Sequence, residues 1–275
     1  MAHASVILLW VAFLLYGAAF AVFVVGFFGR HPGLNRVGLV IAAVALVFHT
    51  AAIVTRGVDV GRLPFVGAYE SLIMVAWSVA LVWHVLESLT KMKAVGLYVM
   101  PVILALLTAA LVAYKPSATL GPALRSDIVI LHVGVMLTAI GCLYVAGGAG
   151  IIYLLEESMI KRHKLSSVLG RLPSLASLDR LVYHATLLGV PFLTAGMAAG
   201  VIRAVTYEVP HWWYDPLVLL SITAWAMYIA LLYGRLRGEW GGGRIAWLAL
   251  AGLVLLFVIR FAAVPYLSGF HNYGG

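Results

Sequence analysis

Residues 4–28 read ASVILLWVAFLLYGAAFAVFVVGFF, an apolar run without a single charged side chain. About 20 such residues cross the hydrocarbon core of a membrane as a helix. Seven more runs of this kind follow, near 36–55, 67–89, 94–113, 127–155, 181–205, 216–234 and 244–264. The runs are continuous rather than alternating, which favours helices over a barrel, because lipid obliges each segment to satisfy its own backbone hydrogen bonds. We therefore predict an all-α polytopic membrane protein, a bundle of eight transmembrane helices.

The composition of the whole chain agrees with this prediction. Of the 275 residues, 64% are hydrophobic and 10% are charged, against about a quarter charged in soluble domains. The first run resembles a signal peptide in its position, but the leading MAHAS carries no Lys or Arg, the run is too long, and Arg30 comes after it. We expect a retained helix and, because no domain boundary is visible, one transmembrane domain over residues 1–275.

The distribution of basic residues predicts the orientation. With the N-terminus outside, twelve of the 18 Lys and Arg residues fall in inner loops and six lie on the outer side. The positive-inside rule then places both termini outside, together with the loop PHWWYDP at 210–216. The net charge of +8 follows from this bias, with some attraction to anionic lipid, and does not indicate nucleic-acid binding.

Three local features refine the expected bundle. The longest polar segment, 156–180, is a basic inner loop with room for a short interfacial helix. The sixth run is interrupted by Gly189 and Pro191, and its GMAAG at 196–200 is a small-xxx-small pattern that allows close helix packing. Cys142 is the only cysteine and lies inside the fifth run, so disulfides, a CxxC redox pair and a CxxCH haem-attachment site are excluded.

Histidines are the most informative ionisable residues, because ionisable groups within a membrane span tend to be functional. Four of the nine are expected at the outer leaflet, namely His49, His132, His211 and His271. A neutral imidazole ligates iron, and two histidines from separate elements can hold a haem from both sides. His132 and His271 are the best such pair for non-covalent haem b, with His49 nearby. Hydrogen-bonded packing histidines remain the alternative.

The loop 210–216 concentrates flat side chains in one place. Trp212, Trp213 and Tyr214 can contact a porphyrin face, although Trp and Tyr also gather at membrane interfaces as anchors. Asp215 before Pro216 suits the N-cap of the seventh helix, with proline at its first position.

Two arginines are expected at the depth of this loop. Arg203 and Arg260 can pair with haem propionates, or can extend to lipid head groups instead. At the inner side, His84 with Glu87, and His184, can form a second site, but an ion pair or side chains that extend to the inner interface are the favoured explanation.

The order of these pieces resembles the CcsA-type cytochrome c assembly proteins and their relatives called HemX, over nearly the whole chain. The matching segments are FHTAAIVTRG (48–57), VGAYESLIMVAWSVALVWHVLE (66–87), ILHVGVMLTAIG (130–141), LDRLVYHATLLGVPFLTAGMAAGVIRA (178–204), WWYDP (212–216) and SGFHNYG (268–274). The resemblance implies an external haem site, a tryptophan-rich loop flanked by two histidines that ligate haem while it is offered to apocytochrome thiols. The matching residues here are His132, His271, Trp212, Tyr214, Asp215 and Pro216.

The chain departs from the assembly branch at two points. The loop continues as YDPLVLL instead of WDPKE, and Tyr233 stands where that branch has a histidine in the following helix. Both departures resemble the HemX branch, which is associated with haem biosynthesis.

Three functions therefore stay open. The first is haem presentation in cytochrome c maturation in a bacterial inner membrane, as a component of a haem lyase with a CcsB-like partner and apocytochrome c. The second is a HemX-type haem-binding regulator without lyase activity. The third is a small-molecule transporter, and quinone binding also stays open.

Overall fold

The computed structural model describes residues 2–29, 31–90, 95–114, 127–162, 173–238, 240–259 and 261–262. Helices make up nearly all of these segments, so the predicted all-α class is confirmed. The elements are α1 (Ala2–Gly29), α2 (Pro32–Val60), α3 (Gly67–Thr90), α4 (Gly96–Val112), α5 (Asp127–Lys161), α6 (Leu175–Thr206), the 3₁₀ turn η4 (Trp212–Tyr214), α7 (Pro216–Leu236) and α8 (Gly242–Val258).

The lengths of these helices fit a membrane protein. Six of them are long and apolar enough to cross a membrane, and α4 and α8 are shorter apolar helices. Each of the two has 17 residues, about 25 Å at 1.5 Å per residue, the lower limit for a span. The protein is a multi-pass membrane protein.

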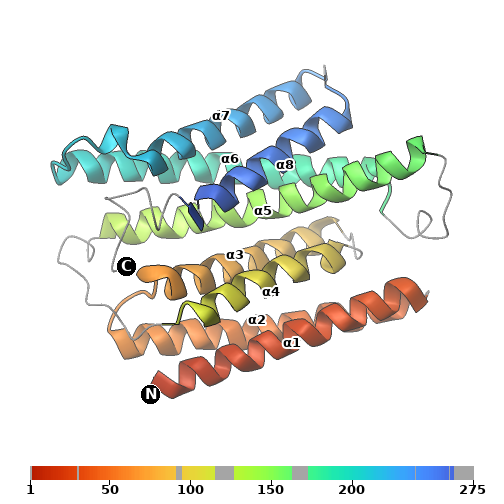
Figure 1. Cartoon of the computed structure of the whole chain (residues 1–275), viewed down its shortest axis with the longest axis horizontal. Coiled ribbons are helices and arrows are strands. Elements are labelled where there is room, and N and C mark those ends of the chain that lie inside the picture. The colour runs from red at the N-terminus through yellow and green to blue at the C-terminus, as the bar shows by residue number, and fades with distance from the viewer. Residues whose placement is uncertain are drawn as a thin grey trace.

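Successive helices run up and down the bundle (Figure 1). The α2–α3 turn at 61–66 and η4 lie at the same end of the bundle. The first helix, α1, begins at this end, and the last helix, α8, runs towards it. We call this the η4 end. An even number of crossings brings the two ends of the described chain to one side, as the sequence predicts.

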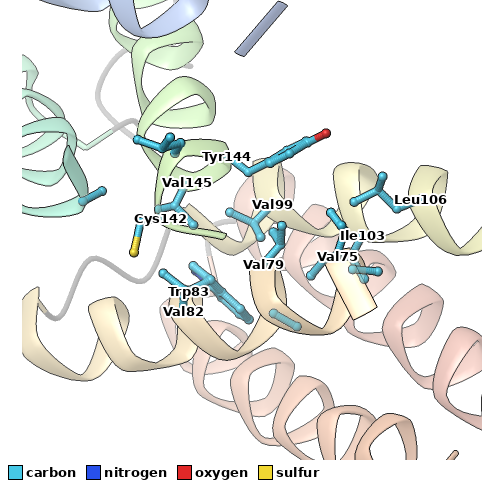
Figure 2. Packing of buried hydrophobic residues seen from close by; sticks show 14 of the residues in the cluster. Val75, Val79, Val82, Trp83, Val99, Ile103, Leu106, Cys142, Tyr144 and Val145 are labelled. Carbon is cyan, nitrogen blue, oxygen red and sulfur yellow. The ribbon is translucent and has the colours of Figure 1, made fainter. Parts of the chain in front are cut away.

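The apolar core lies where α3, α4 and α5 meet (Figure 2). Trp83 of α3 is buried there and meets Phe23 of α1 edge to face, with ring centroids 6.1 Å apart. On α5, a Cβ at Gly141 would lie 2.7 Å from the backbone oxygen of Ser78. Only glycine therefore allows α5 to pack this closely on α3.

Hydrogen bonds between helices add to this packing at two places. The indole Nε1 of Trp77 on α3 donates to Thr50 Oγ1 on α2 at 2.9 Å. Trp225 on α7 donates in the same way to Thr194 on α6, also at 2.9 Å. Each threonine hydroxyl in turn donates to a carbonyl one turn earlier on its own helix. Such bonds contribute about 0.6 kcal/mol each in membranes and set the helix register.

A buried cluster of charges joins α2 to α3 at the η4 end. Glu70 accepts from Arg56 Nε at 3.1 Å, from Arg62 Nη1 at 2.6 Å and from the Val66 backbone N–H at 3.0 Å. The Arg56 guanidinium also lies 5.5 Å from the centre of the Tyr69 ring. Because one carboxylate satisfies two guanidinium groups and a backbone donor, this cluster can stay out of water.

Two sequence expectations are wrong in detail. α6 is continuous from Leu175 to Thr206 with Pro191 inside it, so the sixth run is not interrupted, since a membrane helix tolerates proline where its neighbours compensate. The polar segment 156–180 is helical at both of its ends, because α5 continues to Lys161 and α6 starts at Leu175, where Ser174 caps it, while residues 163–172 lie outside the described residues. The broken helix that favoured a transporter is therefore absent. The single domain over 1–275 stays a prediction.

We expect Glu70→Ala to destabilise the bundle by about 3–5 kcal/mol, because it leaves two buried guanidinium groups without a carboxylate. The measurement is an SDS titration in mixed micelles followed by circular dichroism. Lys161→Ala is the control, since its pair with Glu157 is solvent-exposed and should contribute less than about 1 kcal/mol. Equal losses in the two variants would contradict a buried role for Glu70.

The orientation can be tested with alkaline phosphatase fusions, which are active only outside the cytoplasm. We expect activity for a fusion at the C-terminus and none for a fusion at Gly238, between α7 and α8, because basic residues gather at that end. The reverse pattern would invert the predicted orientation.

Candidate functional site

His132 is held by the backbone of a neighbouring helix. It lies near the start of α5, and its Nδ1 is 2.7 Å from the carbonyl oxygen of Gly196 on α6. A carbonyl can only accept, so Nδ1 carries the proton and donates it. In the neutral ring the lone pair is then on Nε2, the form in which histidine ligates a metal.

The α6 face opposite His132 is made of glycines. A Cβ at Gly200 would lie 3.0 Å from His132 Cε1, and one at Gly196 would lie 2.5 Å from Met136 Sδ. Met136 follows His132 by one helical turn, so both side chains are on the same face of α5. The GMAAG motif is thus a packing motif, as the sequence indicates, and it packs against the histidine.

Arg203 continues this face of α6 towards the η4 end. Positions 196, 200 and 203 follow the helical period, so they share one side of the helix. Arg203 is only 7% exposed, and its guanidinium lies 5.5 Å from the centre of the Tyr207 ring. A buried cation therefore lies about one helical turn beyond Gly200, the glycine against which His132 packs, and shortly before the aromatic loop.

The aromatic rings of η4 are largely exposed. Trp213 and Tyr214 keep 48% and 69% of their surface, and His211 enters the turn with a φ of +55°. The planes of Trp212 and Trp213 are inclined by 82°, and those of Trp213 and Tyr214 by 51°. Because neighbouring rings are not coplanar, a flat ligand can lie on the face of one ring at a time in this conformation.

Asp215 joins the aromatic turn to α7. Its side chain accepts a hydrogen bond from Leu217 N at 2.9 Å, and Pro216 occupies the first helical position. The predicted N-cap is confirmed. The cap fixes the direction in which α7 leaves η4.

The family described as cytochrome C assembly protein matches residues 65–271. The chain belongs to the cytochrome c assembly protein family. The match starts just before α3, so it includes Glu70, His132, Gly196 and the aromatic loop, whereas α1 and α2 precede it.

Curated relatives cover the chain more fully. It is 28% identical to the cytochrome c biogenesis protein CcsA of Gloeobacter violaceus, over 99% of this chain and 94% of that protein. The CcsA proteins of Trieres chinensis and Guillardia theta are 29% and 28% identical, over 90% and 84% of this chain and 89% and 83% of their own lengths. This multi-pass membrane protein thus has its role in cytochrome c maturation.

Not all predicted site residues of this cytochrome c assembly protein are found in the region around His132. His49 on α2 is completely buried and meets Tyr16 of α1 edge to face at 6.0 Å. Its ring nitrogens have no hydrogen-bond partner among the described residues, although the backbone of Ile73 is near. No contact in these segments joins His49 to His132. Arg260 and His271 lie outside the described residues.

Tyr233, which the resemblance aligns with the assembly-branch histidine, lies near the end of α7 away from η4. It is 54% exposed, and Arg237 lies 5.2 Å from its ring centre. No group of three or more His, Cys, Asp or Glu in the described part of the chain could hold a metal ion.

Sequence reasoning missed two features of this region. One is the carbonyl of Gly196 as the partner of His132, which no side-chain pattern reveals. The other is the cluster around Glu70, for which a signal existed, since Arg56 and Glu70 are charges within or beside apolar runs and such charges are usually paired.

We expect Asp215→Ala to destabilise the protein by about 1 kcal/mol through loss of the α7 cap, and Asp215→Ser to restore most of that loss, because serine also caps helices well. SDS titration of the purified variants measures both values. A serine variant as unstable as the alanine variant would show that Asp215 acts through something other than the cap.

Proposed function

We propose that this chain binds haem b non-covalently at the η4 end, on the outer face of a bacterial plasma membrane, and presents it to apocytochrome c. The observation that carries the proposal is the hydrogen bond from His132 Nδ1 to Gly196 O. It leaves Nε2 as a ligand held in one orientation, which is the usual arrangement of histidines that bind metals.

Arg203 and the aromatic turn support the same proposal. A buried guanidinium about one helical turn beyond Gly200 suits a propionate, because it offers planar, charge-assisted hydrogen bonds. The half-buried ring of Trp212 and the exposed rings of Trp213 and Tyr214 offer apolar contact to a porphyrin edge or face. We propose His271 as the second axial ligand, on the resemblance alone, and Arg260 as a second cation.

In this proposal the protein binds haem and orients it, and its own side chains take little part in the chemical reaction. When bound, haem supplies the iron and the porphyrin periphery at which thiols react. His132 would hold one axial position, and Arg203 would fix the orientation of the ring in its plane. The reductant and the delivery of the thiols require partners, which we propose to be a CcsB-like membrane protein and the apocytochrome.

Tyr233 favours a second candidate function. Its phenol is exposed and lies against Arg237, so this position lacks the histidine that the assembly branch would offer to a second haem inside the membrane. A HemX-type protein that binds haem and regulates its synthesis, without attaching it, would need only the site at the η4 end.

We expect His132→Ala to lower haem content by more than about tenfold, since even the hydrogen-bond partners of a metal ligand contribute 10–100-fold to affinity. Oxidised and dithionite-reduced spectra of the purified protein measure this, and holocytochrome c in a complementation strain measures function. His184→Ala is the matched control, because its Nδ1 bonds Arg180 O on its own helix, far along α6 from the η4 end.

The outcomes separate the candidates. Loss of haem together with loss of holocytochrome c in His132→Ala supports presentation. Loss of haem with normal c-type cytochromes and altered haem precursors in a deletion strain supports the regulator. Unchanged haem and normal maturation in His132→Ala and in the double variant with His271→Ala would exclude both.

A further inference from the structure

The hydrogen bond of His132 ends on a backbone atom inside a continuous helix. Gly196 O also accepts the N–H of residue 200 in the regular α-helical pattern, so this carbonyl serves two donors, one for each lone pair. A side chain can reach a carbonyl within a helix only where the helix surface is bare. The residue that leaves it bare is Gly200.

The geometry at Gly200 is specific to the imidazole. A Cβ there would lie 3.0 Å from His132 Cε1, 3.2 Å from Nδ1 and 4.0 Å from Nε2. The three atoms nearest to it therefore all belong to the imidazole ring. The first two separations are too short for an ordinary contact, so the ring would have to move away from α6. Movement of the ring would lengthen the 2.7 Å bond to Gly196 O.

The other glycine of the motif does something different. A Cβ at Gly196 would meet Met136 Sδ and Cγ, at 2.5 and 2.7 Å, and methionine is flexible enough to yield. The two glycines are four residues apart on one helix face and differ in what they contact. Gly196 makes room for a packing side chain, and Gly200 makes room for the histidine.

We propose that Gly200 is a positioning residue for His132, which keeps Nδ1 on Gly196 O and so holds the Nε2 lone pair at a fixed angle. The effect of Gly200 on haem rests on the proposed function. The effect of Gly200 on the imidazole of His132 is independent of haem, because the hydrogen bond and the close contact involve only atoms of the chain.

The chemical consequence follows from the shared carbonyl. A histidine that donates through Nδ1 is a more basic ligand at Nε2, and its ring cannot rotate without breaking that bond. A displaced ring would lose the preference for one tautomer and would ligate iron at a less defined angle. Affinity, reduction potential and the spectrum of the iron should all respond.

The first test uses the protein without haem. Long-range ¹H–¹⁵N correlation spectra of protein labelled at histidine report which ring nitrogen carries the proton. We expect His132 to be the Nδ1–H tautomer in the wild type, and to become mixed or Nε2–H in Gly200→Ala. His132→Gln assigns the signal.

One further variant controls for helix propensity. Gly134→Ala places a methyl on α5, two residues from His132, where a Cβ meets nothing within 4 Å. It should leave the tautomer unchanged, and Ala is the better helix former. An Nδ1–H signal in Gly200→Ala equal to that of the wild type would overturn the proposal, whatever haem does.

The second test uses haem-loaded protein. Relative to wild type and Gly134→Ala, we expect Gly200→Ala to bind haem about tenfold more weakly, with a raised midpoint potential and a broadened low-spin electron paramagnetic resonance signal. Unchanged haem properties alongside a changed tautomer would overturn the link to haem and leave the positioning of the ring. Absence of haem from the wild type would instead overturn the proposed function.

A third measurement keeps α6 intact, in case Gly200→Ala does not fold. In haem-loaded His132→Gly, added imidazole can fill the vacated position and donate to Gly196 O, whereas 1-methylimidazole bound through its free nitrogen cannot. We expect imidazole to restore the wild-type spectrum at a concentration about tenfold lower than the concentration of 1-methylimidazole that is needed. Equal restoration by the two compounds would contradict a role for this hydrogen bond.

Discussion

The close approach of α5 to α6 is the contact on which the site at the η4 end depends. Lipid is as apolar as a leucine side chain, so two membrane helices associate through packing and hydrogen bonds rather than through water exclusion. Gly189, Gly196 and Gly200 leave room on α6 for Cys142, Met136 and His132 of α5. Because η4 follows α6 directly, the same contact fixes the aromatic turn relative to the histidine.

α5 packs against other helices by the same means. A Cβ at Gly147 would lie 2.5 Å from Leu253 of α8, and one at Gly150 would lie 2.9 Å from the Ala246 backbone oxygen. Together with Gly141 against α3, these positions make α5 the helix around which the others assemble. Figure 1 shows it between α3 and the group formed by α6, α7 and α8. The charges around Glu70 meanwhile hold α2 and α3 together at the same end as His132.

Parts of the candidate site could be predicted from the sequence, and parts could not. The cap at Asp215 could, because it depends only on local backbone geometry and on the next two residues. The depths of His49 and His132 could also be estimated by counting along their helices. Their different surroundings could not, since depth along a helix does not say which side of it faces which neighbour. His49 is enclosed beside Tyr16, and His132 lies against the α6 backbone.

The sequence by itself determined the all-α membrane class, the eight helices and most of their ends, because hydrophobic length and caps are local properties. It did not determine that Pro191 leaves α6 continuous, that α5 extends to Lys161, or that a glycine carbonyl is the partner of His132. Those outcomes depend on the rotation and register of one helix against another. The rotation and register are determined by close contacts between residues that are far apart in the sequence, and these contacts form only in the folded bundle.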